Sequence, residues 1–82
     1  MNKELSESAS SYEEWELLAR ELIELELERK GLRYKDLAFL LKEIGIDESP
    51  TQINRKVNRK RFSAAFLIAC MQAMGVKSIS IV

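Results

Sequence analysis

The chain has 82 residues, of which 46% are apolar, and its 13 basic residues balance 13 acidic ones. This length and composition predict one folded domain with a modest core and exclude a disordered chain. Zinc clusters, internal disulfides and membrane-spanning helices are also excluded, because the chain has one cysteine, no histidine and no run of ~20 apolar residues. Since no apolar leader is visible, we expect a cytoplasmic protein with no membrane partner.

The charges are distributed unevenly along the chain. Residues 1–30 carry four Lys or Arg against nine Glu, a balance of −5, whereas residues 31–82 carry nine Lys or Arg against four Asp or Glu, a balance of +5. Five of those nine cations fall between Arg55 and Arg61. A phosphate responds to charge within a Debye length of ~8–10 Å, so a local cluster matters more to it than the neutral sum. Taken alone, such a run is equally typical of a solvated helix face.

The N-terminal third predicts a tail and one helix. Residues 1–10 are polar and without periodicity, so we expect a flexible tail there. Ser11 with Glu14 three residues on forms a capping-box pattern, and Gly31 is a typical residue to follow a helix that ends near Lys30. We expect Trp15 to anchor the core. The apolar face is wide, because two stripes at helical spacing lie side by side, Trp15/Leu18/Leu22/Leu25 and Ala19/Ile23/Leu27.

Two shorter helices are predicted next. The first runs from Lys35 to about Ile44 and ends at Gly45; its apolar positions follow the amphipathic template, at Leu37, Leu40, Leu41 and Ile44. The second has the strongest start signal in the chain, because Ser49 is a good N-cap, Pro50 suits the first helical position and Gln52 completes a capping box. It should end near residues 58–60.

The C-terminal part predicts a buried helix and a strand. The helix from Ala64 to Met74, with Ser63 as its N-cap, is apolar except for Gln72, so it should be buried on all sides, which a partner subunit would help to achieve. Residues 77–82 alternate polar and apolar side chains and predict a short strand, which either frays or pairs with the same strand of a second copy. The residues expected in such a homodimer interface are Phe66, Cys70, Met74, Ile79 and Ile81.

The helix after Ser49 carries the functional signal. It has only two apolar residues, Ile53 and Val57, so it is anchored along one edge. The remaining side chains are of the kinds that read base edges and grip phosphates, and Gln with adenine or Arg with guanine discriminates bases by ~1–3 kcal/mol. We expect Thr51, Gln52 and Arg55 at base edges and Asn58, Arg59, Lys60 and Arg61 along phosphates, with Lys35 as a further phosphate contact and Arg33 as a weaker one.

The stretch from about residue 20 to residue 76 resembles the phage-repressor-like (Cro/repressor, XRE-type) helix-turn-helix domain. The pieces that carry the resemblance are Glu28–Leu32, Tyr34–Ala38, Ile53–Arg61 and Met74–Val76. The chain departs from that pattern in Tyr34, where a small N-cap is usual, and in residues 43–49, where the turn is longer by about one helical turn. The resemblance implies an all-α, four-helix lambda-repressor-like bundle over residues 11–76. The chain also looks like a short uncharacterised bacterial family of this class, which implies no function of its own.

These patterns predict a small, sequence-specific DNA-binding protein and transcriptional regulator that reads the major groove of double-stranded DNA with residues 50–60. The alternative is a protein–protein interaction module, adaptor-like or antitoxin-like, that uses the acidic first helix and the apolar fourth helix without binding DNA. No enzyme is expected, because Cys70 has no histidine to activate it and no glycine-rich phosphate loop is present. Neither a cofactor, a metal nor a small-molecule substrate is expected.

Overall fold

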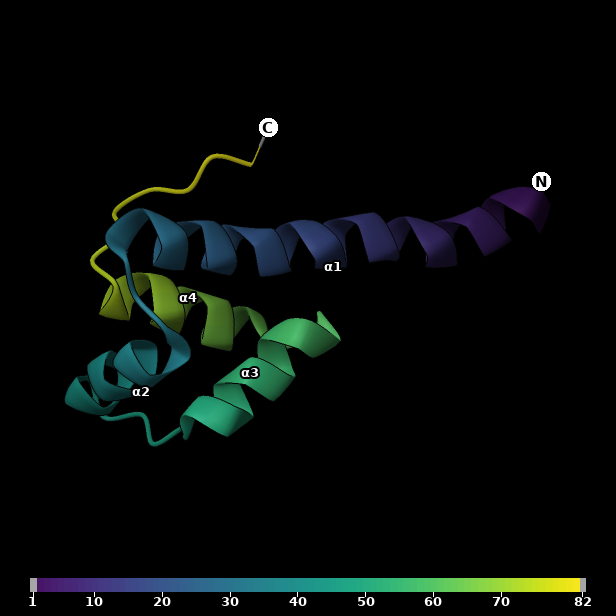
Figure 1. Ribbon diagram of the computed structural model, residues 1–82. Coiled ribbons are helices and arrows are strands. Elements are labelled where there is room, and N and C mark those ends of the chain that lie inside the picture. Colours follow the sequence, from purple (N-terminus) through teal and green to yellow (C-terminus); the bar gives the residue numbers. More distant parts are fainter. Residues whose placement is uncertain (1, 82) are drawn as a thin grey trace.

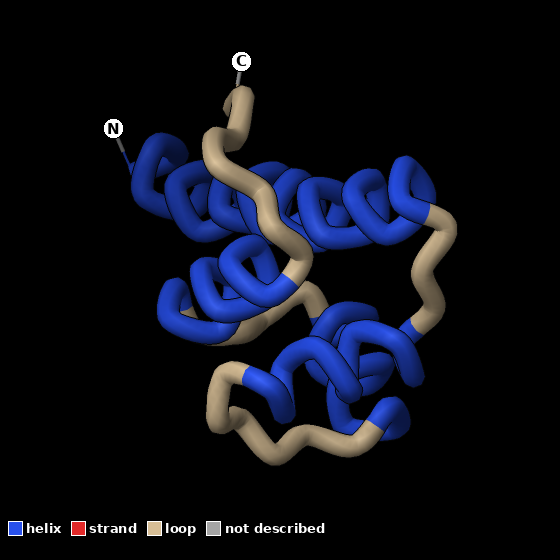
Figure 2. Tube along the Cα trace, turned by 90° about the vertical axis from the view of Figure 1, so that its left-hand side faces the viewer, coloured by secondary structure: helices blue, strands red, loops and turns tan. Residues whose placement is uncertain are grey.

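The computed structural model describes the backbone of residues 2–81 and the side chains of residues 12–81. It contains four helices, α1 (Asn2–Lys30), α2 (Tyr34–Glu43), α3 (Pro50–Arg59) and α4 (Ala64–Ala73). The long α1 lies along one side, α4 and α3 pack against it, and α2 packs against α3 and α4 (Figure 1). Helices and loops account for all of the backbone between residues 2 and 81, which confirms the all-α class (Figure 2). None of these helices is both long and apolar enough to cross a membrane.

The two ends of α1 compare differently with the sequence prediction. The start expected at Ser11 is wrong, since the backbone is already helical from Asn2, and residues 2–10 contain no Gly or Pro that would interrupt it. Nothing tests the flexibility predicted for residues 1–10, which stays a prediction. The end is confirmed: Gly31 takes φ +64°, and the Leu32 N–H donates to the Leu27 carbonyl oxygen at 2.8 Å. This is the 6→1 bond of a Schellman motif, which favours glycine.

All four helices contribute to one apolar core. α1, α2 and α3 each supply a pair of side chains four residues apart, which share one helix face and point to the same interior. α4 supplies the largest share, and its Cys70 thiol is fully buried, which raises the pKa of that thiol to about 12. The buried residues are Ile23, Leu27, Leu37, Leu41, Ile53, Val57, Phe66, Cys70, Met71 and Met74.

One expectation about burial is wrong. Trp15 does not anchor the core, because 57% of it is exposed and Ile23 and Leu27 from the other stripe of α1 face inward instead. Within one copy α4 is not buried on all sides, since Ile68 is 64% exposed, and its burial by a partner subunit stays a prediction. α4 packs against α1 and α2 with one face only, so its opposite face reaches solvent whatever its polarity.

The C-terminal segment does not form the predicted strand over residues 77–81, and residue 82 lies outside the described part. A strand needs a partner to satisfy its N–H and C=O groups, and the described chain offers none. The segment instead runs back beside α1 (Figure 1), and Ile79 borders a groove with Leu22, Leu25 and Met71. Pairing of this segment between two copies stays a prediction.

Candidate nucleic-acid interface

The start of α3 is fixed by the capping box that the sequence predicts. The Ser49 Oγ accepts a hydrogen bond from the Gln52 backbone N–H at 3.1 Å, and the Gln52 Oε1 accepts one from the Ser49 backbone N–H at 2.8 Å. Pro50 occupies the first turn, where its missing N–H costs nothing. These contacts define the first turn of α3 without help from the rest of the fold.

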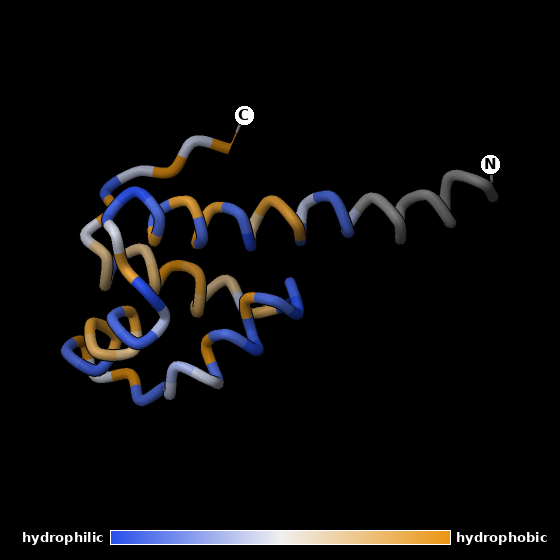
Figure 3. The backbone as a smooth tube through the Cα atoms, in the orientation of Figure 1, coloured by the Kyte–Doolittle hydropathy of each residue, from blue (hydrophilic) through white to orange (hydrophobic). Residues whose placement is uncertain are grey.

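α3 is anchored by one edge and exposed on the other, as expected. Ile53 and Val57 are fully buried, and the five residues of the predicted outward arc, Thr51, Gln52, Arg55, Asn58 and Arg59, are all exposed. The hydropathy colouring shows the same division, with apolar points recurring at helical spacing along a helix that is otherwise hydrophilic (Figure 3). Arg55 lies opposite the buried edge and projects furthest from the core.

Two of the predicted base-reading and phosphate-binding amides are engaged within the protein. Bidentate pairing with adenine uses both the oxygen and the nitrogen of an amide, but the Gln52 oxygen is occupied by the Ser49 N–H. The Asn58 Nδ2 donates to the Asn54 carbonyl oxygen at 2.9 Å and also contacts the Asn54 side-chain oxygen. While it caps the helix, Gln52 keeps its NH₂ group and one lone pair of its oxygen free, but the cap fixes the orientation of the amide, and Asn58 is held against the helix surface.

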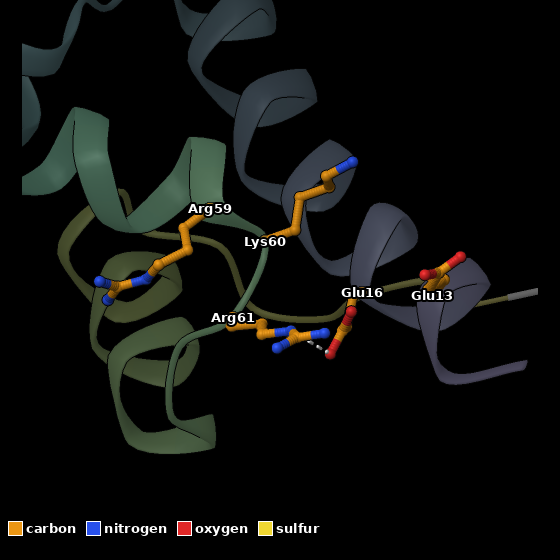
Figure 4. A pocket seen from close by; sticks show the side chains of 5 residues that line it. All are labelled: Glu13, Glu16, Arg59, Lys60 and Arg61. Carbon is orange, nitrogen blue, oxygen red and sulfur yellow. Dashed lines mark ion pairs between the residues drawn. The ribbon is translucent and has the colours of Figure 1, made fainter. Parts of the chain in front are cut away.

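The cations at the C-terminal end of α3 differ in their surroundings. The Arg61 Nε lies 3.2 Å from the Glu16 Oε2 of α1, so this cation is paired within the chain (Figure 4). Arg61, Arg59 and Lys60 line a hollow together with Glu13 and Glu16 of α1. The Arg59 side chain points away from these two carboxylates (Figure 4). Within residues 12–81, Arg55, Arg59 and Lys60 form no ion pair, and all three are exposed.

Lys56, the fifth cation of this cluster, holds the turn before α3 in place. Its Nζ pairs with the Glu48 carboxylate and lies 5.0 Å from the centre of the Phe66 ring. Both contacts point Lys56 inward, which fits its partial burial and removes it from any external interface. Sequence reasoning missed this function, because a pair eight residues apart across a turn leaves no periodic signal.

The start of α2 is tied to α1 and lies beside α3. The helix begins at Tyr34, one residue earlier than predicted, and the Arg33 N–H donates to the Asp36 Oδ2 at 2.8 Å. The Tyr34 hydroxyl donates to the Glu24 Oε2 of α1 at 2.9 Å, and Arg20 lies 3.4 Å from the same carboxylate. Lys35 follows directly and is exposed, so this network fixes where the predicted second phosphate contact lies.

The contacts of Tyr34 with Glu24 predict that the stability of the fold falls at alkaline pH. Burial, and then the hydrogen bond and charge of Glu24, raise the pKa of Tyr34 from 10.0 to about 12. The fold thus favours the un-ionised phenol, so this contribution is complete below pH 10 and is lost as the pH rises towards 12. The buried Cys70 thiol, raised from 9.0 to about 12, acts in the same direction.

We therefore expect thermal unfolding to shift to lower temperature between about pH 8 and about pH 11. Tyr34→Phe should cost about 1 kcal/mol at the lower pH, through the lost hydrogen bond, and should flatten the decline. The exposed Tyr12→Phe is the matched control and should behave as the wild type. Equal slopes for Tyr34→Phe and Tyr12→Phe would show that the Tyr34 phenol is not the titrating group.

The predicted interface residues fall into separate groups. The exposed cations Arg55, Arg59 and Lys60 share the α3 end of the molecule, whereas Phe66, Cys70 and Met74 of the predicted dimer interface pack inside the chain's own core. Ile79 and Ile81 are exposed, at 38% and 63%. Within the described residues, no three His, Cys, Asp or Glu side chains are placed to hold a metal ion.

Comparison with known proteins identifies a family. The model of a family described as a domain of unknown function (DUF6471) matches residues 15–79, which include the whole of α2, α3 and α4 and most of α1. No curated protein and no solved structure is a significant match.

Proposed function

We propose that this chain, which belongs to the DUF6471 family, binds double-stranded DNA through α3 and acts as a small transcriptional regulator. The observation that carries the proposal is the outward face of α3. There Arg55, Arg59 and Lys60 are exposed and form no ion pair within residues 12–81. A helix held by one apolar edge with free guanidinium groups on the other fits a DNA groove better than it fits a protein core.

The parts of α3 take different roles in this proposal. The DNA major groove is about 12 Å wide and admits a helix. Arg55, which lies opposite the buried edge of α3, reaches guanine O6 and N7. Thr51 lies one turn earlier on the same arc and contacts a base edge or phosphate. Arg59 and Lys60 bind phosphates at the far end, and Lys35 on α2 binds a phosphate on the other side. Gln52 serves mainly to cap the helix.

Supporting this proposal is the likeness of the helix order to Cro/repressor-type helix-turn-helix domains. α2 packs against α3, and the Glu48–Lys56 ion pair stiffens the long turn between them. A stiffened turn keeps α3 at one angle to α2, which a groove-binding helix needs. The additional residues of the turn shift α3 relative to that pattern, so we expect Lys35 to contact a phosphate further from α3 than in the shorter-turned domains.

The homodimer is part of the same proposal. Two copies would place their recognition helices about 34 Å apart and would favour a palindromic target. Because Phe66, Cys70 and Met74 are buried within one chain, the dimer contact must use exposed apolar residues, of which Ile68, Ile79 and Ile81 are the candidates near α4 and the C-terminal segment.

Fluorescence anisotropy of a mixed-sequence duplex, measured at increasing salt concentration, tests the DNA-binding proposal. The three phosphate contacts by Arg59, Lys60 and Lys35 predict a slope of log K against log salt of about −3. Affinity should then fall by about 40-fold between 50 and 200 mM salt. Absence of binding at the lowest salt concentration would refute the proposal and would leave the cations of α3 as a solvated face.

The second candidate function is a protein-interaction module, and one observation favours it. Trp15 and Leu25 of the acidic α1 are 57% and 52% exposed, on a face that α2, α3 and α4 do not cover. This face adjoins the end of α3, where Trp15 lines a hollow with Lys60, but Leu25 and Arg55 belong to one surface each, so the two functions can be separated by substitution.

A further inference from the structure

One edge of α1 carries an apolar stripe that the core covers only in part. Trp15, Leu18, Leu22 and Leu25, here called the α1 stripe, are separated by three, four and three residues. This is the spacing of a coiled-coil seam, in which one helix buries its apolar positions against another helix. Leu18 and Leu22 are half-buried, but Trp15 and Leu25 are each more than half exposed. Leu22 and Leu25 also border a groove with Ile79 of the C-terminal segment. Within the described residues no helix lies on the stripe, so the domain offers a helix-binding seam that this segment covers only in part.

Carboxylates border this stripe. Glu14, Glu21 and Glu28 recur every seven residues and form a row along one side of it, and within residues 12–81 none of them pairs with a cation. Leu25 itself lines a hollow together with Glu21, Glu24 and Glu28. On the other side of the stripe, Glu26 is paired with Arg29 at 2.9 Å. At the N-terminal end, Trp15 lines a hollow with Lys60 and Arg61, so the unpaired carboxylates flank mainly Leu18, Leu22 and Leu25. A partner that covers the α1 stripe must therefore place its own charges opposite a row of unpaired carboxylates.

From these two observations, we propose that the α1 stripe docks an amphipathic helix of another protein whose apolar seam is flanked by Lys or Arg. The apolar side chains of the partner would cover Trp15 and Leu25, and its cations would lie against Glu21 and Glu28. This is the arrangement in which opposite charges beside a seam choose the partner. The proposal goes beyond DNA binding and does not depend on it.

Charge disfavours the other occupants. If a second copy packed its own α1 stripe here, an antiparallel pair would set the Glu14–Glu21–Glu28 row against the same row, and a parallel pair would set that row against Glu26. Like charges that face each other across a seam favour other partners. A nucleic acid or an anionic membrane surface is repelled by the same carboxylates.

A synthetic peptide of three heptads with Leu at the seam positions and Lys on both sides serves as the probe. It is titrated into the full chain, with calorimetry for affinity and emission of Trp15, the single tryptophan, for location. We expect saturable binding with a blue shift, because the peptide covers the indole. A peptide with Glu in place of every Lys should not bind.

Leu25→Asn should lower the affinity for the Lys peptide by tenfold or more. Leu17→Asn is the matched control, because Leu17 is also exposed, at 38%, but lies off the stripe, and it should bind as the wild type. The double variant Glu21→Gln with Glu28→Gln should weaken binding and reduce its salt dependence. All three should bind duplex DNA as the wild type does, so failure of this proposal is distinguishable from failure of the proposed function.

Three results would overturn the proposal. The first is no binding of the Lys peptide, or equal binding of the Glu peptide. The second is equal loss for Leu25→Asn and Leu17→Asn with circular dichroism unchanged, which would move the contact away from the stripe. The third is sedimentation of the wild type as a dimer at micromolar concentration that becomes monomeric in Leu25→Asn, which would assign the stripe to a second copy.

Discussion

Replacing Arg55 and Arg59 together by alanine is expected to weaken duplex binding by about 10²-fold and to lower the salt slope by about 1, through the phosphate contact of Arg59. The two guanidinium groups lie one turn apart on the exposed arc of α3 and form no ion pair within residues 12–81. Each charged contact to DNA contributes about 1–3 kcal/mol, and 1.4 kcal/mol corresponds to tenfold in affinity.

The matched control is the double variant Lys42→Ala with Lys77→Ala. It removes the same number of charges from exposed positions outside α3, so it separates a local contact from the effect of overall charge. Its affinity should fall by less than about threefold. Because neither Arg55 nor Arg59 contacts the core, the test variant should also unfold at the wild-type temperature. If both pairs lowered affinity equally, the duplex would be responding to net charge, and the assignment of α3 would fail.

Arg61 differs from Arg55 and Arg59, because it is paired within the chain. Glu16 already neutralises it, so a phosphate must displace that carboxylate before Arg61 can contribute. Sequence alone placed Arg61 with the other phosphate contacts, because the approach of α1 to the end of α3 cannot be read from a run of cations. The basic surface of α3 is thus limited at one end by α1. The cations without an ion pair within residues 12–81 in this region are Arg55, Arg59 and Lys60.

Local signals were reliable where a few neighbouring residues determine the backbone. The start of α3 follows from Ser49 and Gln52, whose two hydrogen bonds are formed within four residues. The end of α1 follows from Gly31, because a left-handed residue terminates the helix there. The outward arc of α3 was also predictable, since only Ile53 and Val57 could face the interior.

Apolar periodicity failed to predict the buried face where two faces of one helix are equally apolar. Both stripes of α1 look suitable for a core, and the docking of α4 and α3 decides that Ile23 and Leu27 face inward while Trp15 faces out. The same ambiguity affects α4, whose apolar residues exceed what its neighbours can cover, so Ile68 is exposed. Periodicity gives the spacing of a face, but the choice between two such faces depends on contacts that are distant in sequence.

The distribution of charge in the fold explains how a neutral chain can serve two partners. The excess of carboxylates lies on α1 and the excess of cations on and around α3, and the two meet at the Glu16–Arg61 pair. Local potentials at the two surfaces therefore have opposite sign, although the net charge is zero. A cationic helix on the α1 stripe and a duplex on α3 would not compete for the same residues.

Ile53→Ala is expected to be the most destabilising single substitution in α3. The side chain is fully buried, so its removal loses apolar burial and leaves a cavity, at a cost of about 2–4 kcal/mol in the free energy of unfolding. For a domain of this size, that lowers the unfolding temperature by about 10–20 °C. Ile53→Val deletes a single methylene and should cost only about 0.5–1.5 kcal/mol.

Ile53→Ala should also affect DNA binding beyond its effect on stability. Leu41→Ala empties a fully buried site in α2, and its cost should be similar. α3, however, is attached by only two buried side chains, so losing one of them loosens the helix that the proposal places in the groove. Measured at a temperature where both variants are folded, Ile53→Ala should lose duplex affinity several-fold and Leu41→Ala should not. Equal affinities would mean that the orientation of α3 is set by the capping box and by the Lys56–Glu48 pair rather than by its apolar edge.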